Sequence, residues 1–244
     1  MKLLSVEEFK GYIFSLKVTR SVNKIQLHHT WEPSYDNFNG SNHLALQKGM
    51  RNHHVNTNGY SDIAQHFTIF PDGKICTGRN INSIPAGIKG ANTGAICIEC
   101  LGNFDVGGDV MTVEQKNAIV SVVKILLDRF GLDAKTGVVY HAWWSSDQKA
   151  LGTYVPGKSV KTCPGTAFFG GNTREAFEKN LLPLLEVKKT LLETGNDIVW
   201  ELMNGPLKVQ ISEVQKAVKA LDQAKNNPEY NSLYWIIYKI VNNR

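Results

Sequence analysis

The sequence predicts an α/β fold, in which a central mixed β-sheet is flanked by helices and is followed by a small all-helical C-terminal domain. Three observations predict it. Strand-like and helix-like segments alternate up to Pro183, one pair of strand-like segments is joined as a hairpin, and only helical patterns occur after Pro183. We therefore place a domain boundary near residues 183–196, with a first domain of residues 1–183 and a second of residues 196–244.

The first half of the chain contains most of the predicted strands. A capping-box pattern at residues 5–8 predicts a short helix that ends near Leu16. Residues 31–60 are polar and irregular, and we expect a helix only around residues 44–51. The expected strands are residues 24–29, residues 66–70 and 74–77 joined as a hairpin by Pro71-Asp72-Gly73, and residues 95–101, which form a run buried on both faces.

Helices and one further strand follow. A second capping-box pattern at residues 112–115 starts a helix that Gly131 stops. Residues 138–141 form the last predicted strand, and a loop over residues 142–171 leads to a helix near Thr173. The C-terminal domain should contain three helices, at residues 197–203, 212–224 and 231–242.

The role of the predicted C-terminal domain is open. Its aromatic residues could simply fill a three-helix core. They could also bind cell-wall sugars, or the helices could associate into a homo-oligomer. We favour cell-wall targeting narrowly over self-association. The residues concerned are Trp200, Tyr230, Tyr234, Trp235 and Tyr238.

Composition and charge exclude several function classes. A net charge of +5, evenly spread over 244 residues, is too weak to argue for nucleic-acid binding, although it suits an anionic polymer such as bacterial cell wall. The longest apolar stretch, residues 118–127, is too short for membrane insertion. The N-terminus turns acidic before any apolar region, so we expect no signal peptide and synthesis in the cytoplasm. Action outside the cell would then require release.

Four cysteines do not form a disulfide framework. Cys97 and Cys100 resemble a CxxC metal motif. However, they lie in a predicted strand, where side chains three positions apart point to opposite faces. We therefore interpret both as buried small apolar residues.

Three other residues suit a zinc ion. His28 and His141 end apolar, strand-like runs, and Cys163 lies in a polar loop. Two imidazoles and a thiolate are zinc ligands, and three protein ligands leave a fourth position for water. Alternation along the strand slightly favours His28 over His29 as the ligand. Taken singly, each could be an ordinary polar residue or a buried thiol.

Two charged residues could serve catalysis beside such a metal. Glu99 interrupts an apolar strand, where a buried carboxylate needs a partner or a function. It is either a paired core carboxylate or a general base. Lys161 precedes Cys163 by two residues and would share its direction in an extended loop. It is either a solvated lysine or a group that stabilises an oxyanion.

Six short motifs occur in order along the chain. They are Leu27-His28-His29-Thr30, Asp62-Ile63-Ala64-Gln65-His66-Phe67, Pro71-Asp72-Gly73, Thr77-Gly78-Arg79, Gly102-Asn103-Phe104 and Lys161-Thr162-Cys163-Pro164-Gly165. Together they resemble the zinc-dependent N-acetylmuramoyl-L-alanine amidases (amidase type 2), which include phage endolysins, bacterial autolysins and peptidoglycan recognition proteins. The resemblance covers about residues 20–170.

The resemblance implies a zinc amidase domain at residues 1–183, with one Zn²⁺ per chain bound by His28, His141 and Cys163. It implies bacterial peptidoglycan as partner and cleavage of the amide between the lactyl group of N-acetylmuramic acid and L-alanine. Lys161 matches the family's lysine before the cysteine ligand. Three further residues are candidates for the substrate groove, of which the last two could equally be structural: Trp31, Arg79 and Asn103.

The chain departs from many family members at Gln65, where they carry a tyrosine. An amide cannot exchange a proton at neutral pH, so Gln65 cannot act as acid or base. Other bacterial members carry a glutamate on the strand where this chain has Glu99. In this respect the chain resembles the members that use a glutamate. We therefore expect Glu99 to move the proton.

Two other functions remain to be weighed. The first is a recognition module that binds muropeptides without cutting them, although such modules lose a zinc ligand. The second is a thiol hydrolase with Cys163 as nucleophile and His141 as base. Within the amidase interpretation, the sequence does not separate an endolysin from an autolysin.

Overall fold

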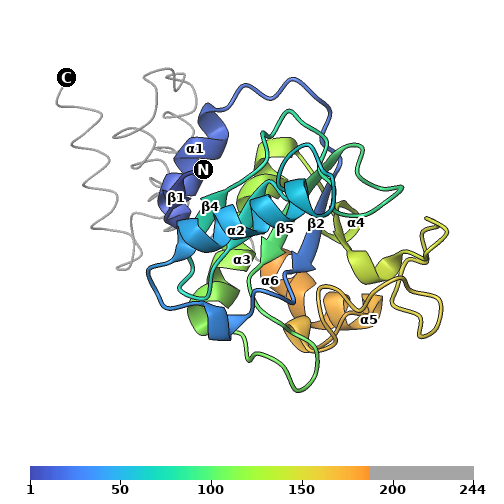
Figure 1. Cartoon of the computed structure of the whole chain (residues 1–244). Helices are drawn as coiled ribbons and strands as arrows, with labels where there is room; N and C mark the ends of the chain where they lie inside the picture. The colour runs from blue at the N-terminus through green and yellow to red at the C-terminus, as the bar shows by residue number, and fades with distance from the viewer. Residues whose placement is uncertain (187–244) are drawn as a thin grey trace, which may run out of the picture. The chain divides into compact units, whose positions relative to one another are not determined.

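A six-stranded mixed sheet organises the chain, and the computed structural model describes residues 1–186 of it (Figure 1). The strand order is β1-β4-β3-β5-β2-β6. Strand β2 is parallel to both β5 and β6, and β5 is parallel to β3, whereas β4 is antiparallel to β3 and β1. The predicted mixed α/β sheet is therefore confirmed. The strands are β1 (Leu3–Leu4), β2 (Lys24–His29), β3 (Phe67–Ile69), β4 (Ile75–Thr77), β5 (Ala95–Cys100) and β6 (Val138–Tyr140).

Helices cover both faces of the sheet. Helices α1 and α3 pack on each other and, with β2, β3 and β5, enclose the main apolar core. A smaller apolar cluster of Phe70, Cys76 and Leu101 packs beneath Leu46 of α2, which crosses the front of the sheet in Figure 1. The helices are α1 (Val6–Ser15), α2 (His43–Asn56), α3 (Val113–Phe130), α4 (Ala134–Gly137), α5 (Arg174–Ala176) and α6 (Leu182–Glu186).

Short helical turns complete the described part of the chain. Three are 3₁₀ turns, and the fourth, η4, is a π-helical segment between α5 and α6. Within residues 1–186, no helix is both long enough and apolar enough to cross a membrane. The predicted C-terminal domain at residues 196–244 lies outside the described residues. The turns are η1 (Tyr35–Asn37), η2 (His141–Trp143), η3 (Phe168–Gly170) and η4 (Phe177–Leu181).

The helix ends follow the predicted caps with one exception. Ser5 and Glu8 form the reciprocal capping box of α1, with bonds of 2.8 and 3.2 Å. Gly131 ends α3 in the left-handed region, at φ 62°. The Thr112 hydroxyl accepts from the Gln115 backbone at the start of α3, but the Gln115 side chain does not reach back. It bonds elsewhere in the core, so the predicted reciprocal box is wrong for α3.

Other differences from the prediction reflect contacts made far along the chain. Strand β1 was not predicted and exists because it pairs with β4. Helix α2 runs to Asn56, beyond the predicted residue 51. His141 belongs to η2 rather than to β6, so it follows its strand instead of ending it. Cys97 and Cys100 are buried free thiols, as predicted.

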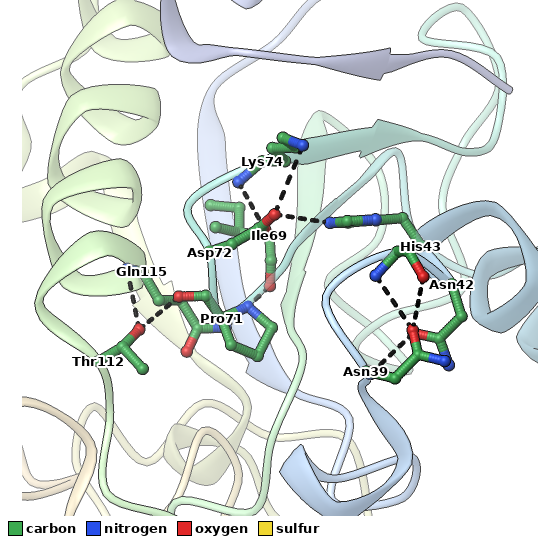
Figure 2. A network of polar contacts seen from close by, with 10 residues as sticks. Asn39, Asn42, His43, Ile69, Pro71, Asp72, Lys74, Thr112 and Gln115 are labelled. Carbon is green, nitrogen blue, oxygen red and sulfur yellow. Dashed lines mark hydrogen bonds and ion pairs between the residues drawn. The ribbon is translucent and has the colours of Figure 1, made fainter.

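The β3–β4 turn is tied to a helix on each side (Figure 2). On the side of α2, His43 Nε2 lies 2.9 Å from the Asp72 carboxylate. On the side of α3, the Thr112 hydroxyl donates to the Pro71 carbonyl. The buried Gln115 amide donates to the carbonyls of Ile69 and Leu101, both at 2.9 Å, and accepts from the Tyr35 hydroxyl. These bonds hold two helix starts and the hairpin in one arrangement.

Candidate active site

Three adjacent parallel strands bring the predicted residues to one edge of the sheet. Register pairs Leu27 of β2 with Tyr140 of β6, so His28 lies beside His141, one residue beyond each. Their ring centroids are 5.0 Å apart. On the other side of β2, the register pairs His28 with Glu99 of β5. The carboxyl ends of parallel strands are where α/β proteins gather functional side chains.

The loop that carries Cys163 is fixed by contacts on both sides of the cysteine. The Ala142 N–H donates to the Cys163 carbonyl at 2.7 Å, which ties the loop to η2 beside His141. The Asp105 carboxylate accepts from the Thr166 N–H at 2.9 Å and from the Thr162 hydroxyl at 3.1 Å. One carboxylate therefore holds the residues that flank Cys163 and presents the thiol toward the sheet edge.

Gly165 is required by this arrangement. Its φ of 119° lies in the region that favours glycine, and a Cβ at this position would collide with the backbone of Phe104. The next residue in that segment, Asp105, is the carboxylate that holds the cysteine loop. Close approach of the two loops thus depends on the Pro164-Gly165 turn that follows the cysteine.

The structure brings His28, His141 and Cys163 together. One ligand atom from each lies within 4.8 Å of the others, and this group can hold a metal ion. Cys163 Sγ is 3.4 Å from His28 Nδ1. A tetrahedral zinc with usual Zn–N and Zn–S distances places its nitrogen and sulfur ligands about 3.6 Å apart. The observed separation fits such an ion, bound by Nδ1 of His28.

His29 has a different environment from His28. Its Nδ1 accepts a hydrogen bond from the Phe104 N–H at 3.1 Å, so that nitrogen is engaged by the loop. Of the two adjacent histidines, only His28 belongs to the group of three candidate metal ligands. The slight preference that strand alternation gave to His28 agrees with this placement.

The electrostatics of the group suit a divalent cation. Burial lowers the pKa of His28 well below its usual value and lowers the pKa of His141 to about 4, and Lys161 adds to both effects. Both imidazoles are therefore neutral at pH 7, which is the form that binds a metal. Burial, with Glu99 nearby, raises the pKa of the Cys163 thiol, so metal binding must displace a proton from it.

Glu99 lies at a pocket of about 590 Å³ next to this group. Its Oε2 is buried and accepts no hydrogen bond from residues 1–186. Burial raises the pKa of Glu99 to about 8, and the positive charge of Lys161 opposes that rise. A carboxyl with a pKa near neutrality can both accept and release a proton, which is what general acid–base chemistry needs. Lys161 itself is exposed and close enough to Glu99 for its charge to affect the carboxylate.

The three predicted groove residues have different surroundings. Trp31 is 61% exposed and lines the Glu99 pocket and a second, adjacent pocket of about 330 Å³. Asn103 lines only the second pocket. Arg79 lines neither pocket. The residue is 9% exposed, and its guanidinium donates to the carbonyls of Ile63, Asp62 and Ile84. These contacts favour the structural alternative for Arg79.

Trp31 is also held in an uncommon backbone conformation. Its φ is 59°, in the left-handed region that bulky residues avoid. The Trp31 N–H donates to the Gly102 carbonyl at 3.0 Å, and Thr30 Oγ1 accepts from the Gly102 N–H at 2.9 Å. Such conformations persist where neighbouring contacts fix them, and they concentrate at binding sites.

Sequence reasoning missed one wall of the Glu99 pocket. Helix α2 supplies that wall, and no local signal marks its residues, because only tertiary packing places the helix over β5. Gln65 lies on the same pocket and donates to Thr68 Oγ1 at 2.9 Å. The residues of α2 that line the pocket are Ala45, Leu46, Gly49, Met50, His53 and His54.

Comparison with known proteins gives the family. The sequence family described as N-acetylmuramoyl-L-alanine amidase (Amidase_2) matches residues 18–166, more than half of the chain. The chain belongs to this family. The matched range includes the three candidate metal ligands, Glu99 and Lys161. Membership gives the chain a function related to peptidoglycan. No curated protein sequence matches the chain.

Solved structures with the same fold include two peptidoglycan recognition proteins from Drosophila. PGRP-SA is 16% identical, with 68% of this chain and 83% of that chain covered and a TM-score of 0.51. PGRP-LB is 17% identical, with 68% and 89% covered and a TM-score of 0.50. The amidase LysC from Clostridium intestinale URNW is 23% identical, with 66% and 85% covered and a TM-score of 0.45. At these identities, the two recognition proteins show the fold alone.

Proposed function

We propose that this protein is a zinc-dependent N-acetylmuramoyl-L-alanine amidase, which hydrolyses the amide between the lactyl group of N-acetylmuramic acid and L-alanine in bacterial peptidoglycan. One observation carries the proposal. An open group of two histidines and a cysteine lies at the sheet edge, beside a carboxylate whose Oε2 has no partner among residues 1–186. The match of residues 18–166 to the amidase family supports the reaction.

The donor set fits one Zn²⁺ per chain. Two neutral imidazoles and one thiolate are borderline-soft ligands, and three of them leave the fourth tetrahedral position open. When bound, zinc would supply Lewis acidity toward a carbonyl and would lower the pKa of a water molecule. His28, His141 and Cys163 would hold it.

The residues around the ligands would perform the proton transfers. Glu99 would take the proton of the attacking water on its carboxylate and deliver it to the leaving nitrogen of L-alanine. Lys161 would place its ammonium near the oxyanion that forms on the carbonyl oxygen. The pocket between Glu99 and α2 would hold the substrate, with Trp31 at its edge. Gln65 can position substrate but cannot transfer a proton.

The rival thiol mechanism fits the geometry less well. A nucleophilic cysteine needs an accessible thiolate of lowered pKa. Cys163 is only 5% exposed, and its Sγ contacts Nδ1 of His28 at 3.4 Å. The thiol therefore has a better position for metal binding than for attack on a substrate.

The rival recognition function shares the fold but not the complete site. Recognition modules without activity lack a zinc ligand, whereas this chain has all three within 4.8 Å and a carboxylate beside them. Catalysis needs the complete ligand set and the carboxylate, whereas binding alone does not. A turnover measurement separates the two functions.

The test is digestion of purified peptidoglycan by the full chain, followed by mass spectrometry. We expect new amino groups of L-alanine without new reducing sugar ends. Activity should be lost on chelation and return with Zn²⁺. Binding of peptidoglycan without any cleavage by the zinc-loaded protein would favour the recognition function, and activity that persists in chelator would favour the thiol mechanism.

A further inference from the structure

Two buried polar atoms beside the candidate metal ligands have no hydrogen-bond partner among residues 1–186. One is Nε2 of His28 and the other is Oε1 of Gln26. Gln26 and His28 are two residues apart on β2, so their side chains leave the strand on the same face. Gln26 is fully buried and His28 is 2% exposed. Leaving such groups unpaired costs free energy, so their pairing needs an explanation.

The orientation of the Gln26 amide is fixed. Its Nε2 donates to the Ala91 carbonyl at 3.0 Å. A carbonyl only accepts, so the NH₂ group must face Ala91 and the oxygen must face away from it. The unpaired atom of Gln26 is therefore a hydrogen-bond acceptor.

The orientation of His28 makes its unpaired atom a hydrogen-bond donor. Its Nδ1 lies 3.4 Å from Cys163 Sγ, on the side of the metal ligands. An Nδ1 that binds a metal carries no proton, so a neutral imidazole carries its proton on Nε2. The unpaired atom of His28 is then a donor, complementary to that of Gln26.

Gly87 shows that donor and acceptor are neighbours. A Cβ built on Gly87 would lie 3.0 Å from His28 Nε2, and it would collide with Gln26 Oε1. Both atoms thus border the same small space, which only a glycine leaves open. Asn92 Oδ1 holds the loop there, because it accepts from the N–H groups of Gly87 and Ile88 at 2.9 and 2.8 Å.

We propose that Gln26 is a positioning residue for the metal site, because its Oε1 accepts the Nε2 proton of His28 through one bridging water in the space beside Gly87, and thereby presents Nδ1 to the metal. Partners of this kind fix the tautomer and the ring orientation of histidine ligands. Gly87 keeps the space above the two atoms free for this contact. The inference rests on the proposed zinc function.

Cys97 is the competing partner for His28. Its Sγ lies 2.9 Å from the same Cβ position of Gly87 and could accept the proton weakly. A thiol is a poorer acceptor than an amide oxygen, so we assign the role to Gln26. Replacing each partner separately distinguishes them.

The first experiment compares zinc affinity by competition with a chromogenic chelator. We expect Gln26→Leu to weaken Zn²⁺ binding about 10–100-fold, as loss of an outer partner does, whereas Gln26→Glu keeps an acceptor and should retain wild-type affinity. Cys97→Ala should also retain it. Unchanged affinity in a folded Gln26→Leu variant, or a loss confined to Cys97→Ala, would overturn the assignment.

The matched control is Gln47→Leu. Gln47 on α2 is also fully buried, donates from Nε2 to a carbonyl, that of Thr77, and has an unpaired Oε1. It lies outside the metal ligands, so its replacement should lower the melting temperature of the metal-free protein without changing zinc affinity. If Gln47→Leu lost as much zinc affinity as Gln26→Leu, the loss would reflect lower stability of the protein in general. That outcome would refute the proposal.

A second measurement needs no variant. Long-range ¹H–¹⁵N NMR of the zinc-loaded wild-type protein should show His28 protonated at Nε2, with slow exchange of that proton. A His28 ring bound through Nε2 would overturn the proposal even if Gln26→Leu failed to fold. Failure of the wild-type chain to bind zinc would instead refute the proposed function, so the two failures are distinguishable.

Discussion

Two groups of buried polar side chains in the same domain differ in how completely they are paired. At the β3–β4 turn, His43 is paired with Asp72 (Figure 2). Both polar atoms of the Gln115 side chain are bonded as well. At the carboxyl ends of β2 and β5, His28 and Glu99 each keep a buried atom without a partner among residues 1–186. Both groups contain a histidine that is at most 2% exposed.

The difference separates a structural role from a functional one. Buried polar groups in folded proteins are usually satisfied, and a paired network fixes one packing arrangement. An unpaired group that lies among candidate metal ligands or at a pocket can instead serve a metal, a substrate or a proton, unlike the unpaired Oε1 of Gln47, which lies outside the metal ligands. The turn network therefore holds the fold, while the sheet edge is arranged for chemistry. Substitutions in one group should change stability, and those in the other should change metal binding and turnover.

The largest effect is expected at Glu99. Glu99→Gln removes the group that exchanges the proton but keeps its size, so turnover should fall about 10²–10⁴-fold with zinc content unchanged. The measurement is the rate of release of L-alanine amines, together with metal analysis. Glu7→Gln, at an exposed carboxylate on α1 outside the pocket, is the control and should retain activity. A fully active Glu99→Gln variant would remove Glu99 from the mechanism.

The second-largest effect is expected for Cys163→Ser, on zinc affinity. A serine hydroxyl stays protonated at neutral pH and is a poor zinc ligand, so the loss of zinc affinity should exceed the roughly 10–100-fold expected for an outer partner. Chelator competition measures it. Cys76→Ser, at another buried thiol on β4, should bind zinc normally. Tight zinc binding by Cys163→Ser would mean that the third ligand lies elsewhere.

Gln115→Leu tests the other group. It removes the donors to the carbonyls of Ile69 and Leu101, which stay buried, and the acceptor of the Tyr35 hydroxyl. The free energy of unfolding should fall by about 2–4 kcal/mol, measured by urea denaturation of the metal-free protein. Zinc affinity of the folded variant should not change. Weakened zinc binding would show that the two groups are coupled.

The smallest effect concerns His66, a buried histidine whose two ring nitrogens are both bonded. Its Nδ1 accepts from the Cys97 N–H at 3.0 Å, and its Nε2 bonds the Ser83 carbonyl at 3.0 Å. Burial lowers the pKa of His66 to about 3, so between pH 6.5 and 3 the unfolded chain binds the extra proton. This contribution to stability is complete above pH 6.5 and is lost as the pH falls.

The test is the pH dependence of unfolding without metal. His66→Gln should be less stable at pH 7 by on the order of a few kcal/mol or less, and its stability should fall less steeply from pH 6.5 to 4. A variant with the same acid slope as wild type would show that the acid sensitivity arises from other groups.

The sequence predicted much of the fold and several members of the site. The range of β2 is as predicted, because Ile25 and Leu27 alternate with polar residues along the segment, which is the local pattern of a strand. The cap of α1 is local as well. The ligand residues could be singled out because two histidines and a cysteine together form a zinc donor set, and because they lie in an order of motifs that resembles the amidase family. Parallel strands then require the strand ends near the two histidines to meet at one edge.

Other features depend on segments far apart in the chain. Arg79 was a groove candidate, yet its guanidinium serves backbone carbonyls of the loop that it crosses. The α2 wall of the pocket and strand β1 likewise depend on partners that no local pattern reveals. The contact between Gln26, His28 and Gly87 joins a strand to a distant loop, since Gly87 lies 59 residues after His28 in the chain (87 − 28 = 59).

The sequence by itself determined the α/β class, the approximate ranges of the main strands and helices within residues 1–186, and the residue types able to bind zinc and move a proton. These follow from period, caps and side-chain chemistry, which are properties of short segments. The tertiary structure decided which histidine nitrogen faces the cysteine, which buried groups remain unpaired and which arginine is structural. Those outcomes follow from strand register and loop packing, because a hydrogen bond forms only between groups that the whole fold brings within about 3 Å.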